Sequence, residues 1–342
     1  SYMDILKAID EACEGRHFQK FRDINELPED SGRRVLTTGG HYGYLKIAEG
    51  CDKHCTYCII PSLRGRFRSV PQERLIAQAE HMAEQGVKEL ILVAQETTMY
   101  GTDLYGKKTL HLLMKELCKI KGIRWIRVLY CYPEEIYDEL IQVMKEEKKI
   151  CHYLDLPIQH ASDRILKRMG RRTTRAQLTA IIEKLRKEIP DIVLRTTLIT
   201  GFPGETEADH QEVMEFVDEM EFDRLGAFTY SPEEGTPAET MEGQIPEEVK
   251  EERRDEIMEL QQEISLEKGN DRIGQELLVM IEGKVSGESA YIARTYGDAP
   301  KVDGYIFVQT GELLMTGDFA KVRVTGALEY DLIGELADEY TE

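Results

Sequence analysis

The sequence predicts an α/β protein in which an open partial barrel of six β/α units is followed by a small all-β barrel. Between residues 36 and 245, short β-rich segments alternate with longer segments of helical periodicity, and from residue 270 onward the apolar pattern changes to a period of two. The chain has 342 residues, 41% of them hydrophobic, which is enough for one large core and one small one.

Six β-rich segments and the helical stretches between them define the first domain. In the first such helix Pro71 precedes the apolar stripe and Gly86 ends it. Alternating strands and helices favour parallel pairing with right-handed crossovers, and six units are too few to close an eight-fold barrel. Reactive groups are then expected at the carboxyl ends of the strands. The predicted strands are 43–48, 88–94, 123–130, 151–158, 191–199 and 222–230, and the other predicted helices are 107–120, 134–148, 174–188 and 206–220.

The remaining segments complete the predicted domain organisation. Residues 1–35 are expected to form a short helix and a polar linker, and residues 36–245 the partial barrel. Residues 246–269 form a charged connecting helix that stops at Gly269. Residues 270–342 read as about five short strands separated by Gly-rich turns, which is typical of a small β-barrel.

The segment EGCDKHCTYCIIP places Cys51, Cys55 and Cys58 within eight positions of a chain that has only seven cysteines. A closed zinc site needs four ligands, and His54 lies between two of the thiols, where the short backbone would resist a tetrahedron. A cubane iron–sulfur cluster held by three thiolates fits better, because one iron then lacks a protein ligand and can bind a substrate or cofactor. The other four cysteines, at positions 13, 118, 131 and 151, are expected to be plain buried thiols.

Charge and hydropathy indicate a soluble cytoplasmic protein. No apolar run approaches the length of a membrane span, and an odd number of cysteines without a regular framework favours a reducing compartment. The net charge is −20, from 44 basic and 64 acidic residues. This average field repels a polyanion such as tRNA.

The spacing C-x3-C-x-aromatic-C, with Tyr57 as the aromatic residue, resembles the signature of the radical S-adenosylmethionine (SAM) enzymes. Within them the chain resembles the methylthiotransferases, in the segments EGCDKHCTYCIIPSLRGRFRS, ILVAQETTMYG, LPIQHASDRILKRMGR, LITGFPGETEADH and FTYSPEEGTPA, and residues 270–342 resemble their TRAM domain, an OB-like barrel.

The resemblance implies a TIM-like partial barrel whose three cysteines hold one 4Fe-4S cluster with an open iron for SAM. Reductive SAM cleavage would give a 5′-deoxyadenosyl radical that abstracts hydrogen from a C–H bond, followed by sulfur insertion to C–SCH3. The family carries a second 4Fe-4S cluster on an N-terminal domain that this sequence lacks, and it needs an electron donor such as flavodoxin or ferredoxin.

The resemblance also implies cofactor-binding residues at the strand ends. Gln95, Glu96 and Thr97 correspond to the segment that binds the SAM amino group, while Tyr57 and Ile199 would lie against the adenine. Gln159 and Arg195 are candidates for polar contacts, with Arg195 suited to the SAM carboxylate, and Tyr230 is a candidate for the pocket wall. A structural role is an equal alternative for His160, Gln159, Arg195 and Tyr230. Arg64, Arg66 and Arg68 could grip carboxylates or form a solvated face.

The resemblance to the methylthiotransferases implies one of two substrates, an adenosine of tRNA or an aspartate of small-subunit ribosomal protein S12. Residues 270–342 have 6 basic and 14 acidic residues, and residues 246–269 have 4 and 9, so this end favours a basic protein over RNA. The AQET segment also resembles the protein-modifying branch rather than the GQN of the tRNA enzymes. We therefore expect thiomethylation of the β-carbon of an aspartate. A tRNA methylthiotransferase is the alternative, and a non-catalytic iron–sulfur or zinc module is another.

Overall fold

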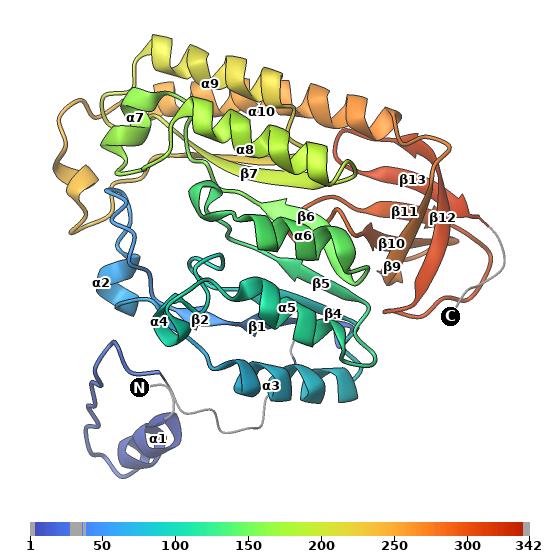
Figure 1. Ribbon diagram of the computed structural model, residues 1–342, viewed down its shortest axis with the longest axis horizontal. Coiled ribbons are helices and arrows are strands. Elements are labelled where there is room, and N and C mark those ends of the chain that lie inside the picture. Colours follow the sequence, from blue (N-terminus) through green and yellow to red (C-terminus); the bar gives the residue numbers. More distant parts are fainter. Residues whose placement is uncertain (1–3, 28–35, 37–38, 338–342) are drawn as a thin grey trace.

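The computed structural model describes residues 4–27, 36 and 39–337. Figure 1 shows a partial barrel joined to a small β-barrel, with α1 standing apart from the body. The described helices are α1 Ile5–Cys13, α2 Ile60–Arg64, α3 Gln72–Glu84, α4 Thr102–Tyr105, α5 Leu110–Cys118, α6 Asp138–Glu146, α7 Asp163–Arg168, α8 Arg175–Glu188, α9 Glu207–Met220 and α10 Glu247–Asn270. The described strands are β1 Tyr42–Lys46, β2 Ala48–Glu49, β3 Arg68–Ser69, β4 Glu89–Val93, β5 Trp125–Val128, β6 Ile150–Asp155, β7 Val193–Thr200, β8 Arg224–Thr229, β9 Glu276–Lys284, β10 Ala290–Thr295, β11 Ile306–Gln309, β12 Phe319–Ala327 and β13 Leu332–Leu336.

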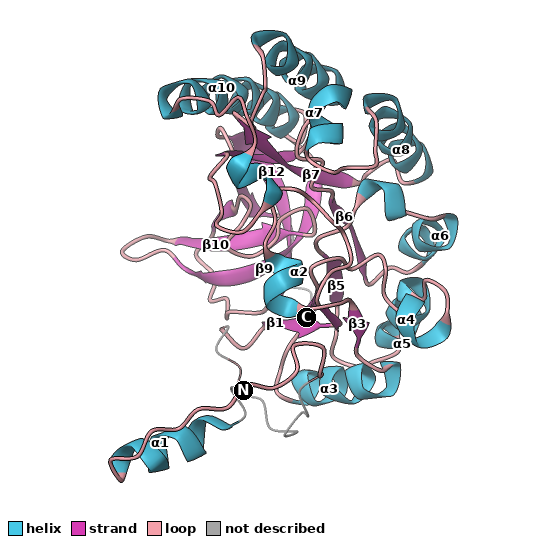
Figure 2. Cartoon of the chain, turned by 90° about the vertical axis from the view of Figure 1, so that its left-hand side faces the viewer, coloured by secondary structure: helices cyan, strands magenta, loops and turns pink. Residues whose placement is uncertain are grey.

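Six parallel strands form one open sheet in the order β1-β4-β5-β6-β7-β8. Consecutive strands are neighbours throughout, as right-handed β/α crossovers require. Figure 2 shows α3, α5, α6, α8 and α9 in an arc outside the strands. The predicted open six-unit β/α barrel is confirmed.

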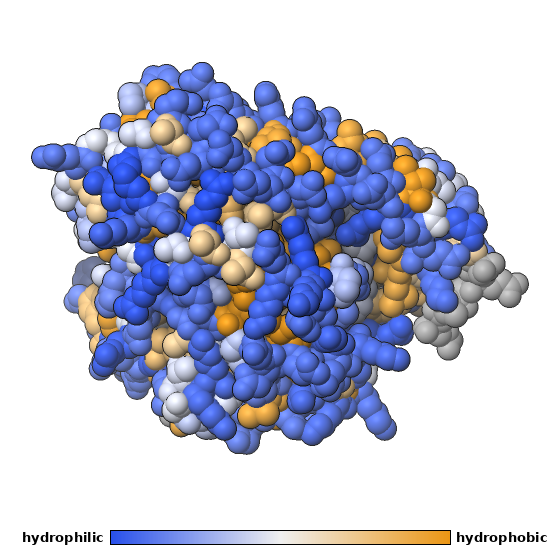
Figure 3. Space-filling view, turned by 45° about the horizontal axis from the view of Figure 1, so that its top comes forward, coloured by the Kyte–Doolittle hydropathy of each residue, from blue (hydrophilic) through white to orange (hydrophobic). Residues whose placement is uncertain are grey.

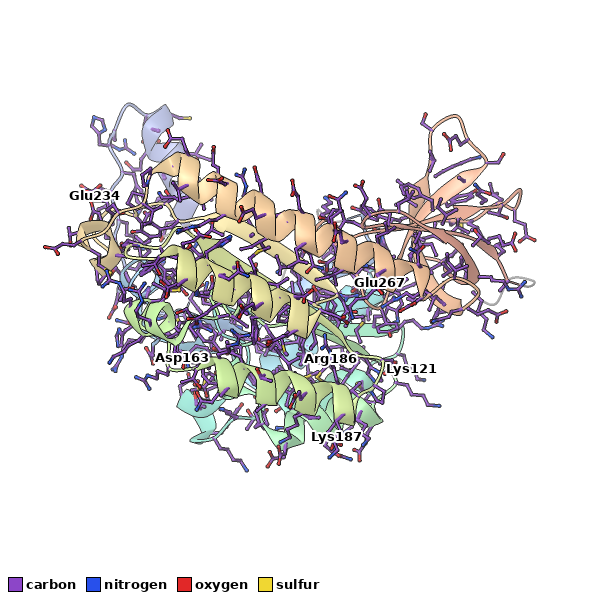
Figure 4. The ribbon with its side chains drawn as sticks, turned by 90° about the horizontal axis from the view of Figure 1, so that it is seen from above. Lys121, Asp163, Arg186, Lys187, Glu234 and Glu267 are labelled. Atoms are coloured by element: carbon purple, nitrogen blue, oxygen red, sulfur yellow. The ribbon has the colours of Figure 1, made fainter. Side chains whose placement is uncertain are left out.

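The five C-terminal strands close into a barrel in the order β10-β11-β13-β12-β9, which confirms the predicted small β-barrel. Figure 4 shows α10 running along the partial barrel toward the β-barrel, with Glu267 near its last turn. The face of α10 that packs is largely polar: Lys250 donates from Nζ to the Tyr230 carbonyl oxygen, and Gln261 donates from Nε2 to the Phe222 carbonyl oxygen.

The domain boundaries proposed from the sequence stay predictions, and most of the predicted linker falls at residues 28–35, outside the described part. Within the described residues, no helix is both long enough and apolar enough to cross a lipid bilayer.

The inward face of the sheet has two different ends. Along β7 and β8, alternate residues point to this face. Near the amino ends, Val193 packs with Met280 and Phe319 of the C-terminal barrel. Near the carboxyl ends, Ile199 and Tyr230 pack in a separate cluster that contains no residue of that barrel. The β-barrel therefore forms the floor of the open barrel and leaves the carboxyl ends of the strands for the site.

Candidate functional site

The cysteine loop follows β1 and is closed by the short β2–β3 hairpin. Gly50 has a φ of +79°, and a Cβ there would lie 2.1 Å from the Arg66 carbonyl oxygen, so the two arms of the loop meet where only glycine fits. The Cys51 N–H donates to the Gly65 carbonyl oxygen at 3.2 Å. The Phe67 N–H donates to Asp52 Oδ1 at 3.1 Å. These contacts fix the backbone that carries the thiols.

The three thiols of this loop lie close enough to influence one another. Cys51 and Cys55 are buried and Cys58 is half-buried. Burial raises the pKa of Cys51 to about 11, and the neighbouring Cys55 and Cys58 raise this pKa further. Burial likewise raises the pKa of Cys58. Without a metal these two thiols stay protonated at neutral pH, so a bound metal must displace their protons.

An iron–sulfur cluster suits three thiol ligands better than a single zinc ion, which needs four ligands. Among the described residues, no three or more His, Cys, Asp and Glu side chains are arranged to hold one metal ion. His54, which could have completed a zinc site, is exposed. A cubane takes each thiolate on a different iron, so its thiolates need not converge on one point. Three thiols on one ordered loop therefore suit an iron–sulfur cluster with one iron left open.

The turn after α7 holds the cysteine loop from outside. The Thr56 N–H donates to the Met169 carbonyl oxygen at 2.9 Å, and Thr56 Oγ1 donates to the Arg168 carbonyl oxygen at 2.8 Å. Gly170 has a φ of +74°, and a Cβ there would lie 2.7 Å from the His54 carbonyl oxygen. The RMGR segment, noted in the sequence only as a family match, thus packs directly on the loop.

The end of β4 offers two buried acceptor atoms without donors. Glu96 is 1% exposed; its Oε1 accepts from the Thr98 N–H and hydroxyl, whereas its Oε2 has no partner. Gln95 Oε1 is also buried and unpaired. Burial raises the pKa of Glu96 to about 7. Because unpaired buried acceptors are costly, these atoms suit a ligand that brings donors, and the SAM ammonium is one.

Thr97 has a different role from its two neighbours. Its N–H donates to the Tyr130 carbonyl oxygen at 3.1 Å, and its hydroxyl donates to the Leu129 carbonyl oxygen at 2.7 Å. These bonds tie the end of β4 to the end of β5. Thr97 therefore positions the segment, and its N–H and its hydroxyl proton are both used within the protein.

An apolar cluster at the ends of β7 and β8 brings together three of the predicted residues. Tyr57, Ile199 and Tyr230 all belong to it. Phe202, which the sequence analysis did not single out although it lies in the LITGFPGE segment, makes edge contacts with both tyrosine rings at centroid distances of 6.4 and 5.3 Å. The Tyr230 hydroxyl is buried and unpaired. The cluster thus contains Tyr57 and Ile199, the two residues expected to lie against the adenine.

Gln159 lies at the end of β6 in the left-handed region, with a φ of +72°. Its N–H donates to the Thr197 carbonyl oxygen, and its carbonyl oxygen accepts from the Ile199 N–H. Tyr130, at the end of β5, has a φ of +60°. Strained non-glycine residues often occur at binding sites. Tyr130 and Gln159 both follow the carboxyl ends of their strands.

Arg195 is already paired within the protein. Its Nη1 donates to Asp155 Oδ1 at 2.9 Å, and its Nε lies 3.3 Å from Oδ1 of Asp303 in the C-terminal barrel. Two carboxylates therefore compete with any external one. These contacts favour the structural role over the SAM contact for Arg195. The same holds for His160, which is buried and accepts the Ser162 N–H at Nδ1.

The other residues singled out in the sequence lie outside this centre. Arg64 and Arg66 are exposed, and Arg68 folds back to donate to the Arg64 carbonyl oxygen at 3.0 Å. Cys131 and Cys151 are buried as expected. The expectation of burial is wrong for Cys13, which is exposed, and for Cys118, which is half-buried.

Two protein-family models match this chain, one in the partial barrel and one in the C-terminal barrel. A model of the radical SAM superfamily matches residues 45–217, and a model of the TRAM domain matches residues 273–337. A Lachnoclostridium phytofermentans protein named ribosomal protein uS12 methylthiotransferase RimO is 61% identical over 334 residues, covering 98% of this chain and 76% of that protein. Proteins of the same name are 51% identical in Clostridium perfringens and 49% in Clostridium botulinum; each match covers 99% of this chain and about three quarters of the relative.

The first model covers the three-thiol loop and most of the open parallel barrel, and the second covers the closed C-terminal barrel. The chain therefore belongs to the radical SAM superfamily and, within it, to the RimO family of methylthiotransferases with a C-terminal TRAM domain.

Proposed function

We propose that this chain is the radical SAM body of a methylthiotransferase that adds a methylthio group to the β-carbon of an aspartate in ribosomal protein uS12. The observation that carries the proposal is the ordered loop of three thiols beside the unpaired acceptors of Gln95 and Glu96. The identity of 61% with a RimO protein supports the choice of reaction and substrate.

Cys51, Cys55 and Cys58 would hold a 4Fe-4S cluster, with SAM bound at the open iron. Together these cofactors supply the radical chemistry that opens an unactivated C–H bond. The Glu96 carboxylate and the Gln95 side-chain oxygen accept hydrogen bonds from the SAM ammonium. Tyr57, Ile199 and Tyr230, with Phe202 between the two tyrosine rings, bind the adenine and exclude water from it.

The substrate enters over the inward face, between the TRAM floor and the cofactor residues. Phe228 on β8 is 57% exposed, and a Cβ on Gly226 would lie within 4 Å of both its ring and Arg195 Nη2, so Phe228 lies on the inward face. Tyr130 is 49% exposed at the end of β5. These two exposed aromatic side chains are suited to hold a peptide loop while its aspartate reaches the cofactor end.

A basic protein partner suits the surface of the C-terminal barrel. Among the described residues from 270 onward, six acidic side chains are exposed (Asp271, Glu276, Glu288, Glu312, Glu329 and Glu335) against four basic ones (Lys284, Lys301, Lys321 and Arg323). The face shown in Figure 3 is mostly hydrophilic, with scattered apolar areas. An acidic surface attracts the basic uS12 and repels tRNA phosphates.

The sulfur and the electron come from outside the described residues. The chain spans about three quarters of the length of the curated RimO relatives. We place a second 4Fe-4S cluster, with the sulfur supply, on the N-terminal part of the longer proteins, and expect flavodoxin or ferredoxin as the donor in the cytoplasm. This chain alone is then expected to cleave SAM without inserting sulfur.

Anaerobic reconstitution tests the cofactor assignment. The chain should take up iron and sulfide and release 5′-deoxyadenosine from SAM when reduced, and Cys55→Ala should lose both properties while keeping its fold. Cys118→Ala, outside the loop, is the control and should behave as the wild type. Zinc in place of iron, or no 5′-deoxyadenosine, would contradict the proposal.

Mass spectrometry of uS12 tests the substrate. Incubation with the reconstituted full-length enzyme should add one methylthio group to an aspartate. The alternative, a tRNA methylthiotransferase, requires tRNA binding that weakens steeply with salt. Modification of tRNA instead of uS12 under the same conditions would overturn the assignment.

A further inference from the structure

Tyr132, in the loop after β5, extends its hydroxyl toward one of the three cysteines. The Tyr132 hydroxyl oxygen and Cys55 Sγ are 3.6 Å apart, within hydrogen-bonding distance for sulfur. Two cations flank the ring: the Arg171 guanidinium lies 4.2 Å from the ring centroid and Lys53 Nζ lies 5.0 Å from it. A phenol donor and two positive charges thus surround the Cys55 corner of the site.

The Arg171 guanidinium is buried without a full set of partners. Its side chain is 1% exposed, and its nearest carboxylate oxygen, Glu134 Oε2, is 3.8 Å away. Its Nη2 donates to the Pro157 carbonyl oxygen, while Nε and Nη1 have no acceptor. Lys53 differs, because it is paired with Glu135. A buried cation so weakly compensated is costly, which points to an anionic group that completes its environment.

The position of Arg171 relative to Cys55 is fixed by the backbone. The preceding residues, Arg168 to Gly170, accept two hydrogen bonds from Thr56 and pack against the His54–Cys55 peptide. Arg171 follows this turn directly. The charge is therefore held at a set distance from Cys55 rather than carried on a free surface side chain.

We propose that Tyr132 and Arg171 raise the reduction potential of the cluster held by Cys51, Cys55 and Cys58. A cluster with three thiolates is an anion, and the incoming electron makes it more negative. A hydrogen bond to the Cys55 sulfur and a nearby fixed cation both stabilise that added charge, and these are the interactions by which proteins set cluster potentials. The inference rests on the proposed function, because it presumes that the cluster binds here.

The step concerned is the transfer of one electron from a low-potential donor, a flavodoxin- or ferredoxin-type protein, or dithionite in the assay, into the oxidised cluster. No bond to Tyr132 or Arg171 forms or breaks, and the phenol keeps its proton. Both are positioning residues that act through Cys55 and the local field, and neither touches the substrate.

Redox titration followed by electron paramagnetic resonance tests the inference on the reconstituted 342-residue chain without SAM. Tyr132→Phe keeps the ring between its cations and removes only the hydroxyl, and Arg171→Met removes the charge. Each should lower the midpoint potential. At a fixed poise near the wild-type midpoint, the ratio of reduced to oxidised cluster should fall roughly tenfold for Arg171→Met, equal to about 59 mV for one electron, and less for Tyr132→Phe. Arg171→Lys should restore most of the loss.

Matched controls come from the same elements. Tyr137 also has a cation over its ring, Lys108 at 5.5 Å, but its hydroxyl meets His111 rather than a cysteine. Arg175 stacks over Phe216 and pairs with Glu219. Tyr137→Phe and Arg175→Met should leave the potential unchanged.

The outcomes separate this inference from the proposed function. If the wild-type chain binds no iron–sulfur cluster, the proposed function fails. If Tyr132→Phe and Arg171→Met bind the cluster fully with the wild-type potential, only this inference fails. If Tyr132→Phe loses the cluster, its hydroxyl retains the cluster rather than setting its potential, and the inference is also overturned.

Discussion

The two ends of the inward face treat buried charges in opposite ways. At the floor, Glu89 is fully buried and accepts hydrogen bonds from Arg127 of the neighbouring strand at 2.8 Å and from Arg294 of the TRAM domain at 2.6 Å. Burial opposes its ionisation, but the two arginines outweigh this effect and lower its pKa. Arg294 also pairs with Glu282, which contacts His41. Apart from Arg127 Nη2, this network is satisfied.

At the carboxyl ends of the strands, several buried polar atoms have no hydrogen-bond partner. Gln95, Glu96 and Tyr230 each keep one buried atom without a partner, and Arg171 keeps two. The cost of these unpaired atoms is offset when a ligand binds, while the floor needs none. The TRAM domain therefore closes the floor of the open barrel with satisfied ion pairs, and the unpaired polar atoms lie at the opposite end.

The largest loss of stability is expected at the floor of the open barrel. Glu89→Gln leaves Arg127 buried without a counter-charge and leaves Arg294 with Glu282 alone, so the free energy of unfolding should fall by about 3–5 kcal/mol. Denaturant unfolding measures the loss. The control is Glu276→Gln, whose partner Arg323 is as exposed as Glu276 itself, and its effect should stay below about 1 kcal/mol. Equal effects of the two substitutions would remove the distinction drawn for the floor.

At the end of β4, replacing the buried carboxyl of Glu96 is expected to raise the free energy of unfolding rather than lower it. Burial raises the pKa of Glu96 to about 7 from 4.5, so the folded state binds this proton more tightly and stability falls as pH rises through that window. Without cofactors, Glu96→Gln should be more stable than the wild type by roughly 2–3 kcal/mol at pH 8 and by under about 1 kcal/mol at pH 5. It should also weaken SAM binding.

Unfolding at both pH values and calorimetric SAM titration of the reconstituted chain measure these effects of Glu96→Gln. The exposed Glu139→Gln serves as the control, with differences within about 0.5 kcal/mol. A destabilised Glu96→Gln at pH 8 would show that this carboxyl is structural, like Glu89.

A smaller effect is expected where the α7 turn meets the cysteine loop. Gly170→Ala adds a Cβ 2.7 Å from the His54 carbonyl oxygen at a φ of +74°, so it should cost about 2 kcal/mol and lower iron uptake. Gly106 has a φ of +70° with nothing within 4 Å, so Gly106→Ala should cost only about 1 kcal/mol and leave iron uptake unchanged. Iron analysis after reconstitution distinguishes the two variants.

The smallest stability effect is expected on the inward face itself. Phe228→Ser changes an exposed side chain, so the free energy of unfolding should change by less than about 0.5 kcal/mol. Binding of uS12, measured by fluorescence titration, should weaken several-fold if the ring holds the substrate. Leu313→Ser, at an 85% exposed position of the TRAM domain, is the control; equal losses for both would move the binding surface away from the open barrel.

The repeating elements could be predicted from the sequence because their periodicity is local. The six predicted strands each overlap a strand of the sheet, and the predicted helix of residues 174–188 is α8, which begins with a capping box at Thr174. The one-turn helices α2, α4 and α7 were missed, since four to six residues are too few to show a period. The packed face of α10 was predicted in part: Ile257 and Ile264 of its apolar stripe are buried. Lys250 and Gln261 on the same face could not be predicted, because they are polar and contact the partial barrel through hydrogen bonds.

Folding removes part of the acidic charge of the TRAM segment from the surface. Three acidic residues of the TRAM segment, Glu282, Asp298 and Asp303, pair with arginines at the domain contact and do not face a partner freely. Arg195, considered for SAM, is held by one of them. Sequence composition cannot distinguish charged side chains that are paired inside the fold from those exposed on its surface.

The sequence alone determined the order of strands and helices, the change to a second barrel and the three-thiol loop, because each depends on residues near one another in the chain. Only the tertiary structure decided which buried polar side chains are paired and which have an atom without a partner. Glu89 and Arg294 are 205 positions apart, and Tyr132 meets Cys55 across 77. Such contacts follow from the packing of whole elements, and no local pattern of residues encodes them.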